Sequence, residues 1–146
     1  MHIIGRIATT TAQEAWAITD RVVLAWEQRQ RSRQKLLTMR GREIALTLPT
    51  GTRLQAGDLL STTEGWVEAD PAPEDVMLIQ PRSRQETAFV AYQIGNRHLP
   101  LEIGEQGLKT VYEPILETYL EQQGLPVERT QLPFTPVSAT SGHPHT

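Results

Sequence analysis

Short apolar runs, some of them with a period of two, dominate the first half of the chain. Residues 22–26 form a compact run rich in β-branched side chains, and residues 43–48 alternate with their apolar side chains on one face. Apolar pairs at residues 59–60 and 66–67 are separated by turn-forming residues. Many short strands with glycine between them predict a small all-β domain.

The clearest domain boundary is the segment from Asp70 to Glu74, where two prolines stand within three residues. Such a segment favours an extended linker over a helix or a strand. We therefore expect a first domain at residues 1–72 and a second domain at residues 73–136. Residues 137–146 are mostly small and polar, and we expect them to form a flexible tail that carries histidines.

The hydrophobic pattern changes its period after this boundary. Residues 84–94 and 111–120 carry apolar side chains at helical spacing. Strands are expected at residues 76–79, 98–103, 107–108 and 127–132. The resulting order of strand, helix, strand, strand, helix and strand predicts a ferredoxin-like βαββαβ domain, and the whole chain is expected to be an α+β protein.

The ends of the two expected helices fit known capping patterns. Gly95 or Asn96 is expected to take the left-handed conformation that ends the first helix. Thr110 and Glu113 have the spacing of a capping box, and Pro114 falls in the first turn of the second helix. The apolar stripe of this second helix comprises Val111, Tyr112, Ile115, Leu116, Tyr119 and Leu120.

Composition and charge exclude several classes of function. The chain has no cysteine, so any metal site must use imidazole, carboxylate, backbone or water, which are ligands compatible with Ni, Cu or Zn. A net charge of −3 argues against nucleic acid or an anionic membrane as partner. Because the sequence shows neither a signal peptide nor an apolar span of about 18 residues, we expect a cytoplasmic protein.

Four cations lie within residues 29–35. This basic run could contact phosphate, but no aromatic residues interleave with the cations as a base-stacking site would require. A solvated edge strand, whose charge discourages pairing with another sheet, is the favoured interpretation.

His98 is the one histidine embedded in patterned sequence. The others are His2, His143 and His145. If Leu99 and Leu101 face the core of a strand at residues 98–103, His98 points to the opposite face, and Pro100 indicates that this strand lies at a sheet edge. A structural histidine, a catalytic base and a metal ligand all remain open.

Each functional interpretation of His98 has a difficulty. For catalysis, Glu102 lies on the same strand face but about 13 Å away, so it cannot orient the imidazole directly. For metal binding, one imidazole holds a divalent ion weakly. A two-fold dimer would bring two copies of His98 together, and His143 and His145 form a His-x-His pair that adds ligands.

Five stretches of the chain resemble the UreE family of urease accessory proteins. The most specific is Ile-Gly-Asn-Arg-His-Leu-Pro-Leu-Glu-Ile at residues 94–103. The others lie at residues 29–35, 41–46, 54–60 and 131–136. They occur in order and extend over nearly the whole chain.

The resemblance implies a homodimeric nickel metallochaperone, not an enzyme, that delivers Ni²⁺ for assembly of the urease active site. It implies a peptide-binding-like first domain, and a ferredoxin-like second domain for metal binding and dimerisation. His98 from each protomer would hold the metal at the interface, with His143 and His145 as auxiliary ligands. Implied partners are the accessory GTPase UreG and the urease apoprotein complex.

Some histidine-rich members of the family carry further histidines where the second helix begins. Residues 110–114 contain none here, so a single shared interface site is the expectation. Zn²⁺ or Cu²⁺ would also bind imidazole, so ligand type alone does not select Ni²⁺. The alternative is a protein-binding scaffold of urease maturation with incidental affinity for Zn, Cu or Ni. An enzyme that uses His98 has the least support.

Overall fold

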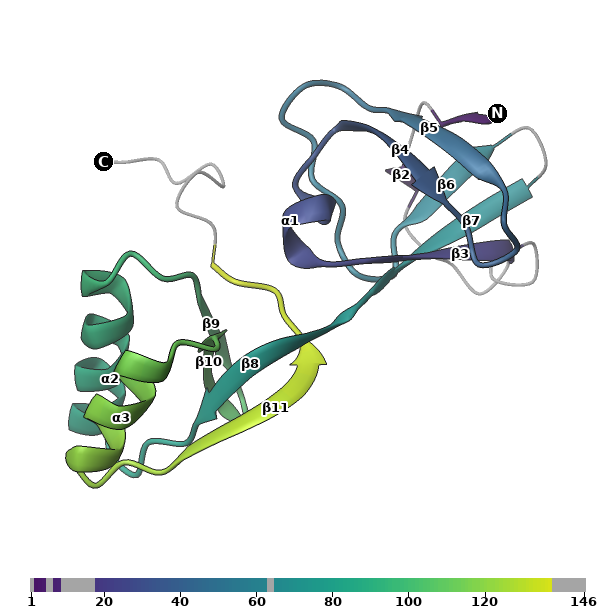
Figure 1. Ribbon diagram of the computed structural model, residues 1–146. Coiled ribbons are helices and arrows are strands. Elements are labelled where there is room, and N and C mark those ends of the chain that lie inside the picture. The colour runs from purple at the N-terminus through teal and green to yellow at the C-terminus, as the bar shows by residue number, and fades with distance from the viewer. Residues whose placement is uncertain (1, 5–6, 9–17, 63–64, 138–146) are drawn as a thin grey trace. The chain divides into compact units, whose positions relative to one another are not determined.

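The computed structural model describes residues 2–4, 7–8, 18–62 and 65–137, and it divides the chain into two compact units. The first unit is Met1–Ala72 and the second is Pro73–Thr146. Figure 1 shows the first unit in purple, blue and teal, and the second unit from teal through green to yellow. The fold class predicted from the sequence, an α+β chain with a β-rich first part and a βαββαβ second part, is confirmed.

Two small sheets make up the first unit. One has the strand order β1-β5-β4 and the other the order β2-β6-β7-β3. The elements are β1 (His2–Ile4), β2 (Ile7–Ala8), β3 (Ile18–Leu24), α1 (Trp26–Arg29), β4 (Arg33–Leu37), β5 (Glu43–Thr47), β6 (Leu59–Thr62) and β7 (Gly65–Pro71). The alternating side chains of Ile44 and Leu46 on β5 are buried beside Leu48, as the period-two pattern predicts.

One strand of this unit, β3, begins and ends earlier than the sequence predicts. The apolar run at residues 22–26 is strand only as far as Leu24, and Trp26 begins the short helix α1. The side chain of Gln28 accepts a hydrogen bond from the backbone N–H of Ala25 at 2.9 Å. This local contact starts a helical turn that an apolar pattern does not reveal.

The basic run at residues 29–35 is divided between two environments. Arg31, Arg33 and Lys35 are exposed, and β4 lies at an edge of its sheet, as predicted. Arg29 differs from this prediction, because it is buried in α1 and its backbone carbonyl accepts a hydrogen bond from Leu54 N–H.

The expectation of a linker outside regular structure at residues 70–74 is wrong. Strand β7 ends at Pro71, and β8 (Pro73–Ile79) begins after the single residue Ala72. Pro71 lies at the end of the β3–β7 pairing and Pro73 at the end of the β8–β11 pairing. Proline is tolerated at strand ends, where its missing N–H leaves few ladder bonds unmade.

Asp20 on β3 joins the two sheets of the first unit. Its carboxylate is buried, and it accepts hydrogen bonds from the backbone N–H groups of Arg21 (2.8 Å) and Arg40 (3.2 Å). Its second oxygen binds Arg42 through Nε and a terminal nitrogen, both at 3.1 Å. Since Arg40 and Arg42 lie in and after the turn from β4 to β5, this one carboxylate holds that turn against β3.

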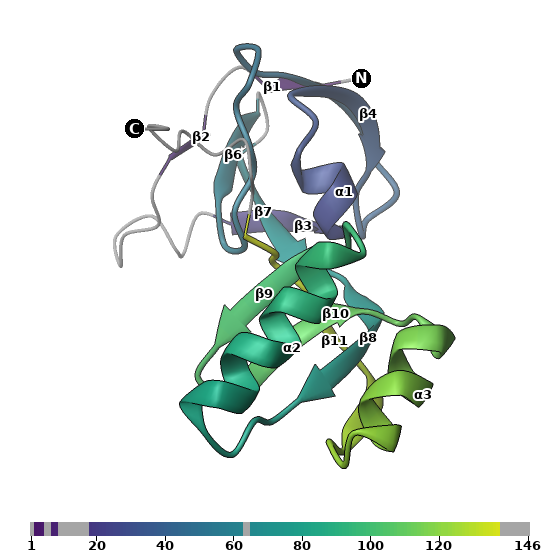
Figure 2. The ribbon, with the colours of Figure 1, turned by 90° about the vertical axis from the view of Figure 1, so that its left-hand side faces the viewer.

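The second unit is a four-stranded antiparallel sheet with two helices on one face. The strand order is β11-β8-β10-β9, and Figures 1 and 2 both show α2 and α3 on the same side of the sheet. Besides β8, the elements are α2 (Arg84–Asn96), β9 (Leu101–Gly104), β10 (Gly107–Val111), α3 (Pro114–Gln122) and β11 (Val127–Pro133). The core between helices and sheet contains Met77, Ile79, Val90, Ile94, Leu108, Leu116, Leu120 and Leu125.

The predicted helix at residues 111–120 is wrong in several details, the first being its start, since Val111 ends β10 and α3 begins at Pro114. Glu113, not Thr110, caps α3: its carboxylate accepts a hydrogen bond from Leu116 N–H at 2.6 Å. Ile115 is 73% exposed, so only part of the predicted apolar stripe faces the core. Since the sheet and α2 cover one side of α3, the remaining apolar side chain stays at the surface.

Candidate metal centre

Helix α2 ends in a Schellman motif that places His98. The N–H of His98 donates to Gly95 O at 2.9 Å, and the N–H of Leu99 donates to Ile94 O at 3.1 Å. These two bonds enclose a residue in the left-handed conformation, and that residue is His98, with a φ of 58°. The sequence-based assignment of this conformation to Gly95 or Asn96 is therefore wrong, because both residues belong to the helix.

The expected strand at residues 98–103 begins only at Leu101. His98 is therefore presented by a helix end and not by strand alternation, although its side chain is exposed, as the prediction required. Leu99 and Leu101 do pack against the core, but Ile103 is 64% exposed, contrary to expectation. Strand β9 lies at the sheet edge, as the proline before it indicated.

Helix α3 ends in the same motif and shows what is unusual about His98. The N–H of Gly124 donates to Glu121 O and the N–H of Leu125 donates to Leu120 O, both at 3.0 Å. Here the left-handed residue is glycine, with a φ of +81°. Within the described ranges, His98 is the only residue other than glycine with a positive φ. A left-handed backbone costs a residue with a Cβ about 1–2 kcal/mol, so the histidine stands where glycine would be more stable.

The cost of a side chain at this position can be measured on α3. Gly124→Ala is expected to destabilise the second unit by about 1 kcal/mol, because a Cβ at Gly124 meets nothing within 4 Å and only the backbone conformation is penalised. Gly95→Ala is the control, since Gly95 lies inside α2 with open space around it and should gain roughly 0.5–1 kcal/mol. Urea unfolding of both variants, followed by circular dichroism, tests the opposite signs. Equal effects of the two substitutions would contradict the assignment of strain to the left-handed site.

The backbone around His98 is fixed on both sides. Before it, Ile94 is fully buried in the core of the unit. After it, Leu99 packs on the same core, and the carbonyl of Pro100 accepts a hydrogen bond from the Thr110 hydroxyl at 2.6 Å. The imidazole therefore projects from a rigid turn, next to the carbonyl end of a 13-residue helix. That end carries a partial negative charge and favours a bound cation.

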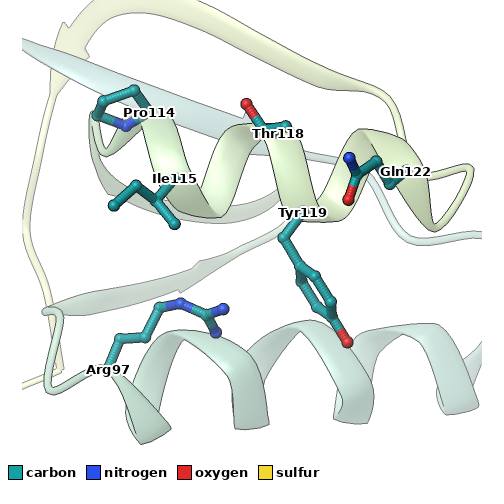
Figure 3. Close-up of a pocket in the computed structure, with 6 residues that line it drawn as sticks. All are labelled: Arg97, Pro114, Ile115, Thr118, Tyr119 and Gln122. Carbon is teal, nitrogen blue, oxygen red and sulfur yellow. The ribbon is translucent and has the colours of Figure 1, made fainter.

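A shallow depression of about 510 Å³ adjoins this turn on the side of α3. Figure 3 shows Arg97 and Tyr119 facing each other across the space between the two helices. The Arg97 guanidinium lies 5.3 Å from the centre of the Tyr119 ring and donates to the Gln93 side chain at 2.7 Å. The other lining residues are Pro114, Ile115, Thr118 and Gln122. None of these side chains is a favourable transition-metal ligand, so the depression itself does not fit a metal ion.

Two of the three predicted ligands cannot be placed. His143 and His145 lie outside the described residues, and only His98 has a position in the structure. Among the residues that the structure does describe, no group of three or more His, Cys, Asp or Glu side chains could hold a metal ion. An exposed single imidazole fits a metal only if further ligands come from a second chain or from outside the described part.

Glu102 is also excluded as an orienting carboxylate for His98. One of its oxygens accepts a hydrogen bond from Thr135 N–H at 2.7 Å, and the other pairs with Lys109 at 3.1 Å. No local pattern of residues predicts these contacts. Over the described residues, no helix is long and apolar enough to cross a membrane.

Comparisons with known proteins agree along the whole chain. Residues 1–68 match the family described as UreE urease accessory protein, N-terminal domain, and residues 74–146 match its C-terminal domain. The Urease accessory protein UreE of Burkholderia pseudomallei (strain 1710b) is 37% identical over 141 residues, which are 96% of this chain and 68% of that protein. The protein of the same name from Paraburkholderia xenovorans (strain LB400) is 36% identical over 125 residues, which are 85% of this chain and 56% of that protein. The chain thus spans between about half and two thirds of the length of such relatives.

Proposed function

The chain belongs to the UreE family of urease accessory proteins, and from this premise we propose that it is a nickel metallochaperone. It is an accessory protein of urease maturation and not an enzyme. Ni²⁺ is its cargo, carried to the urease apoprotein complex with the help of the GTPase UreG. We place this role in the cytoplasm.

The observation that carries the proposal is the position of His98. This residue keeps a left-handed backbone that favours glycine, and its imidazole is exposed at the carbonyl end of α2. Glycine would be more stable at this position, so the histidine carries a cost in stability that a role for its imidazole would explain. Imidazole nitrogen is a suitable ligand for Ni²⁺, and an exposed site with few protein ligands allows the ion to be passed on.

A homodimer supplies the second imidazole. In a two-fold dimer the same surface of both chains meets, so His98 of one protomer approaches His98 of its partner. Ile115, an exposed apolar side chain at the depression beside Arg97, supports an interface near this end of α2. His143 and His145 then add ligands, and Zn²⁺ or Cu²⁺ can compete for the same nitrogen atoms.

Equilibrium dialysis against Ni²⁺, together with a mass measurement of the oligomer, tests the proposal. We expect a dimer with one tightly held Ni²⁺ per two chains. A monomer with no tight Ni²⁺ site would overturn it. A dimer whose affinity for Ni²⁺ does not depend on His98 would favour the alternative function, a protein-binding scaffold with incidental metal affinity.

The tail histidines are expected to strengthen the site without being essential to it. The double variant with His143→Ala and His145→Ala should lose roughly tenfold to hundredfold in Ni²⁺ affinity, because two tethered ligands are removed while both copies of His98 remain. Isothermal titration calorimetry gives the affinity directly. Unchanged affinity would remove these two residues from the set of ligands.

A further inference from the structure

Strand β4 forms an open edge of the first unit. It lies beside β5 (Figure 1) and pairs with β5 alone among the described strands. At the two ends of this pairing, Leu48 N–H donates to Ser32 O and Thr38 N–H donates to Arg42 O, both at 2.9 Å. Since hydrogen-bonded pairs occur at every second residue of an antiparallel ladder, the even-numbered residues of β4 direct their backbone groups to β5. The odd-numbered residues direct theirs to the open edge.

Three residues of β4, namely Arg33, Lys35 and Leu37, therefore present N–H and C=O groups that β5 does not use. The next odd-numbered residue, Met39, confirms this direction, because its N–H donates to Arg21 O on β3 at 2.8 Å. That bond closes the edge at one end. Residues 33–37 remain as a short template to which another extended chain can add by backbone pairing.

The side chains along this edge change from cationic to apolar. Arg33, Lys35 and Leu37 share one face of β4, since successive side chains of a strand point to opposite faces, and all three are exposed. Leu37 is 66% exposed and Met39 is 71% exposed. Apart from Val23 on β3, these are the only large hydrophobic side chains exposed in the described part of the first unit. The edge thus offers positive charge at its start and apolar surface at its end.

The charge of this region indicates what kind of chain can occupy the edge. Residues 20–43 contain seven lysine and arginine side chains and three acidic ones, although the whole chain has a net charge of −3. Arg33 and Lys35 form no ion pair within the described part of the chain. A strand that brings carboxylates opposite these two cations would form favourable cross-strand pairs, whereas a basic strand would be repelled.

Two other occupants fit the edge less well. If two copies of β4 paired by two-fold symmetry around Lys35, the two ammonium groups would lie opposite each other, which is destabilising. A nucleic acid would supply negative charge, but it has no row of peptide groups to pair with β4. The exposed side chains of the edge also include no aromatic ring on which a base could stack.

We propose that β4 binds an extended acidic segment of a partner protein by β-strand addition. In antiparallel pairing, the residues opposite Leu37, Lys35 and Arg33 point to the same face as these side chains. The segment therefore carries an apolar residue followed by two acidic residues at alternate positions. The charge that disfavours pairing of β4 with its own copy gives specificity for this partner. The inference goes beyond the proposed function, because it requires neither Ni²⁺ nor His98.

The test uses the full chain without metal and a blocked, fluorescein-labelled peptide that contains Leu-Thr-Glu-Thr-Glu. Fluorescence anisotropy should show saturable binding of this peptide and none of its counterpart with Leu-Thr-Lys-Thr-Lys. Lys35→Glu and Arg33→Glu are each expected to weaken binding by about tenfold, because an attraction becomes a repulsion. Arg84→Glu is the control, since it reverses an exposed cation at the start of α2 in the second unit, and it should leave binding unchanged.

The backbone pairing is tested on the peptide itself. The first glutamate of the peptide lies opposite Lys35, so its N–H would donate to Lys35 O. N-methylation of this glutamate should abolish binding. N-methylation of the threonine that follows it should be tolerated, because the N–H of that residue points away from β4. Equal effects of the two modifications would contradict strand addition.

Hydrogen exchange measured by NMR locates the bound peptide. In the free chain, the amides of Lys35 and Leu37 should exchange faster than those of Gln34 and Leu36, which β5 protects. The peptide should slow exchange at Lys35 and Leu37 and leave the other two amides unchanged. Full binding of the peptide by both Lys35→Glu and Arg33→Glu would overturn the proposal.

Two further results would also overturn it in favour of another occupant. Protection of the Lys35 and Leu37 amides that rises with protein concentration, without peptide, would assign the edge to a second copy of the chain. Binding of oligothymidylate more tightly than the peptide, with loss in Lys35→Glu, would assign it to nucleic acid. Because no Ni²⁺ is present in these experiments, none of their outcomes bears on the proposed function.

Discussion

Replacement of His98 by glycine is expected to abolish tight Ni²⁺ binding and to leave the fold intact. In the proposed dimer both imidazole ligands of the shared site are lost, so we expect the affinity to fall by on the order of a hundredfold or more, about 2.7 kcal/mol. Glycine is the residue that the left-handed position favours, so the turn after α2 should persist. The loss of binding can then be assigned to the imidazole.

Alanine at the same position provides the comparison. His98→Ala removes the imidazole equally but keeps a Cβ on a left-handed backbone, so it should bind Ni²⁺ no better than His98→Gly while being less stable by about 1 kcal/mol. Calorimetric titration with Ni²⁺ and urea unfolding of the three proteins measure both quantities. If His98→Gly bound Ni²⁺ as tightly as the wild type, His98 would not be a metal ligand. The protein-binding scaffold would then be the better explanation of the function.

The order of elements in the second unit could be predicted because its signals are local. Apolar side chains at helical spacing mark α2, and period-two alternation with flanking glycine marks short strands. The exposure of Ile115 could not be predicted, because it depends on which side of α3 the sheet and α2 leave uncovered. The sequence also placed a linker at the two prolines of residues 70–74, where extended backbone continues as strand instead.

His98 was identified as the candidate ligand for a partly wrong structural reason. Strand alternation predicted an outward side chain, whereas a helix-terminating turn provides it. The conformation of this turn is set by Ile94 and Leu99, whose side chains both pack in the core. That packing involves residues distant in sequence, and so does the bond from Thr135 to Glu102, which spans 33 residues. Local patterns therefore predicted the candidate residue but not its geometry.

Replacement of Asp20 by asparagine is expected to destabilise the first unit by about 2–3 kcal/mol. The buried carboxylate is the common acceptor of two backbone N–H groups and of the Arg42 guanidinium, and the neutral amide removes the negative charge that these donors share. The three tryptophans, Trp16, Trp26 and Trp66, all belong to this unit, so tryptophan fluorescence reports its unfolding selectively. The midpoint of thermal unfolding should fall by roughly 10–20 °C.

The same carboxylate predicts how stability depends on pH. Burial raises the pKa of Asp20, but hydrogen bonds from Thr38, Arg21, Arg42 and Arg40 together outweigh it and hold the pKa below its ordinary value. Because the pKa of Asp20 is lower in the folded state, the stability that its carboxylate provides is fully present above the unfolded-state pKa of about 3.9. That stability is lost as the pH falls through the pKa of the folded state. The first unit of the wild type should therefore lose stability below about pH 4, and Asp20→Asn should lose less over that range.

Asp75→Asn in the second unit is the matched control for Asp20→Asn. Asp75 also binds an arginine, Arg129, at 2.9 Å, and that contact likewise lowers the pKa of Asp75. Its pair is exposed to water, however, and lies within one sheet, so its loss should change the stability of the second unit little. Circular dichroism of the whole chain measures this effect, because the tryptophans report only the first unit. The contrast tests whether burial and the joining of two sheets, and not the ion pair alone, give Asp20 its effect. Equal stability of the Asp20→Asn variant and the wild type at neutral pH would show that the turn from β4 to β5 is held to β3 by other contacts.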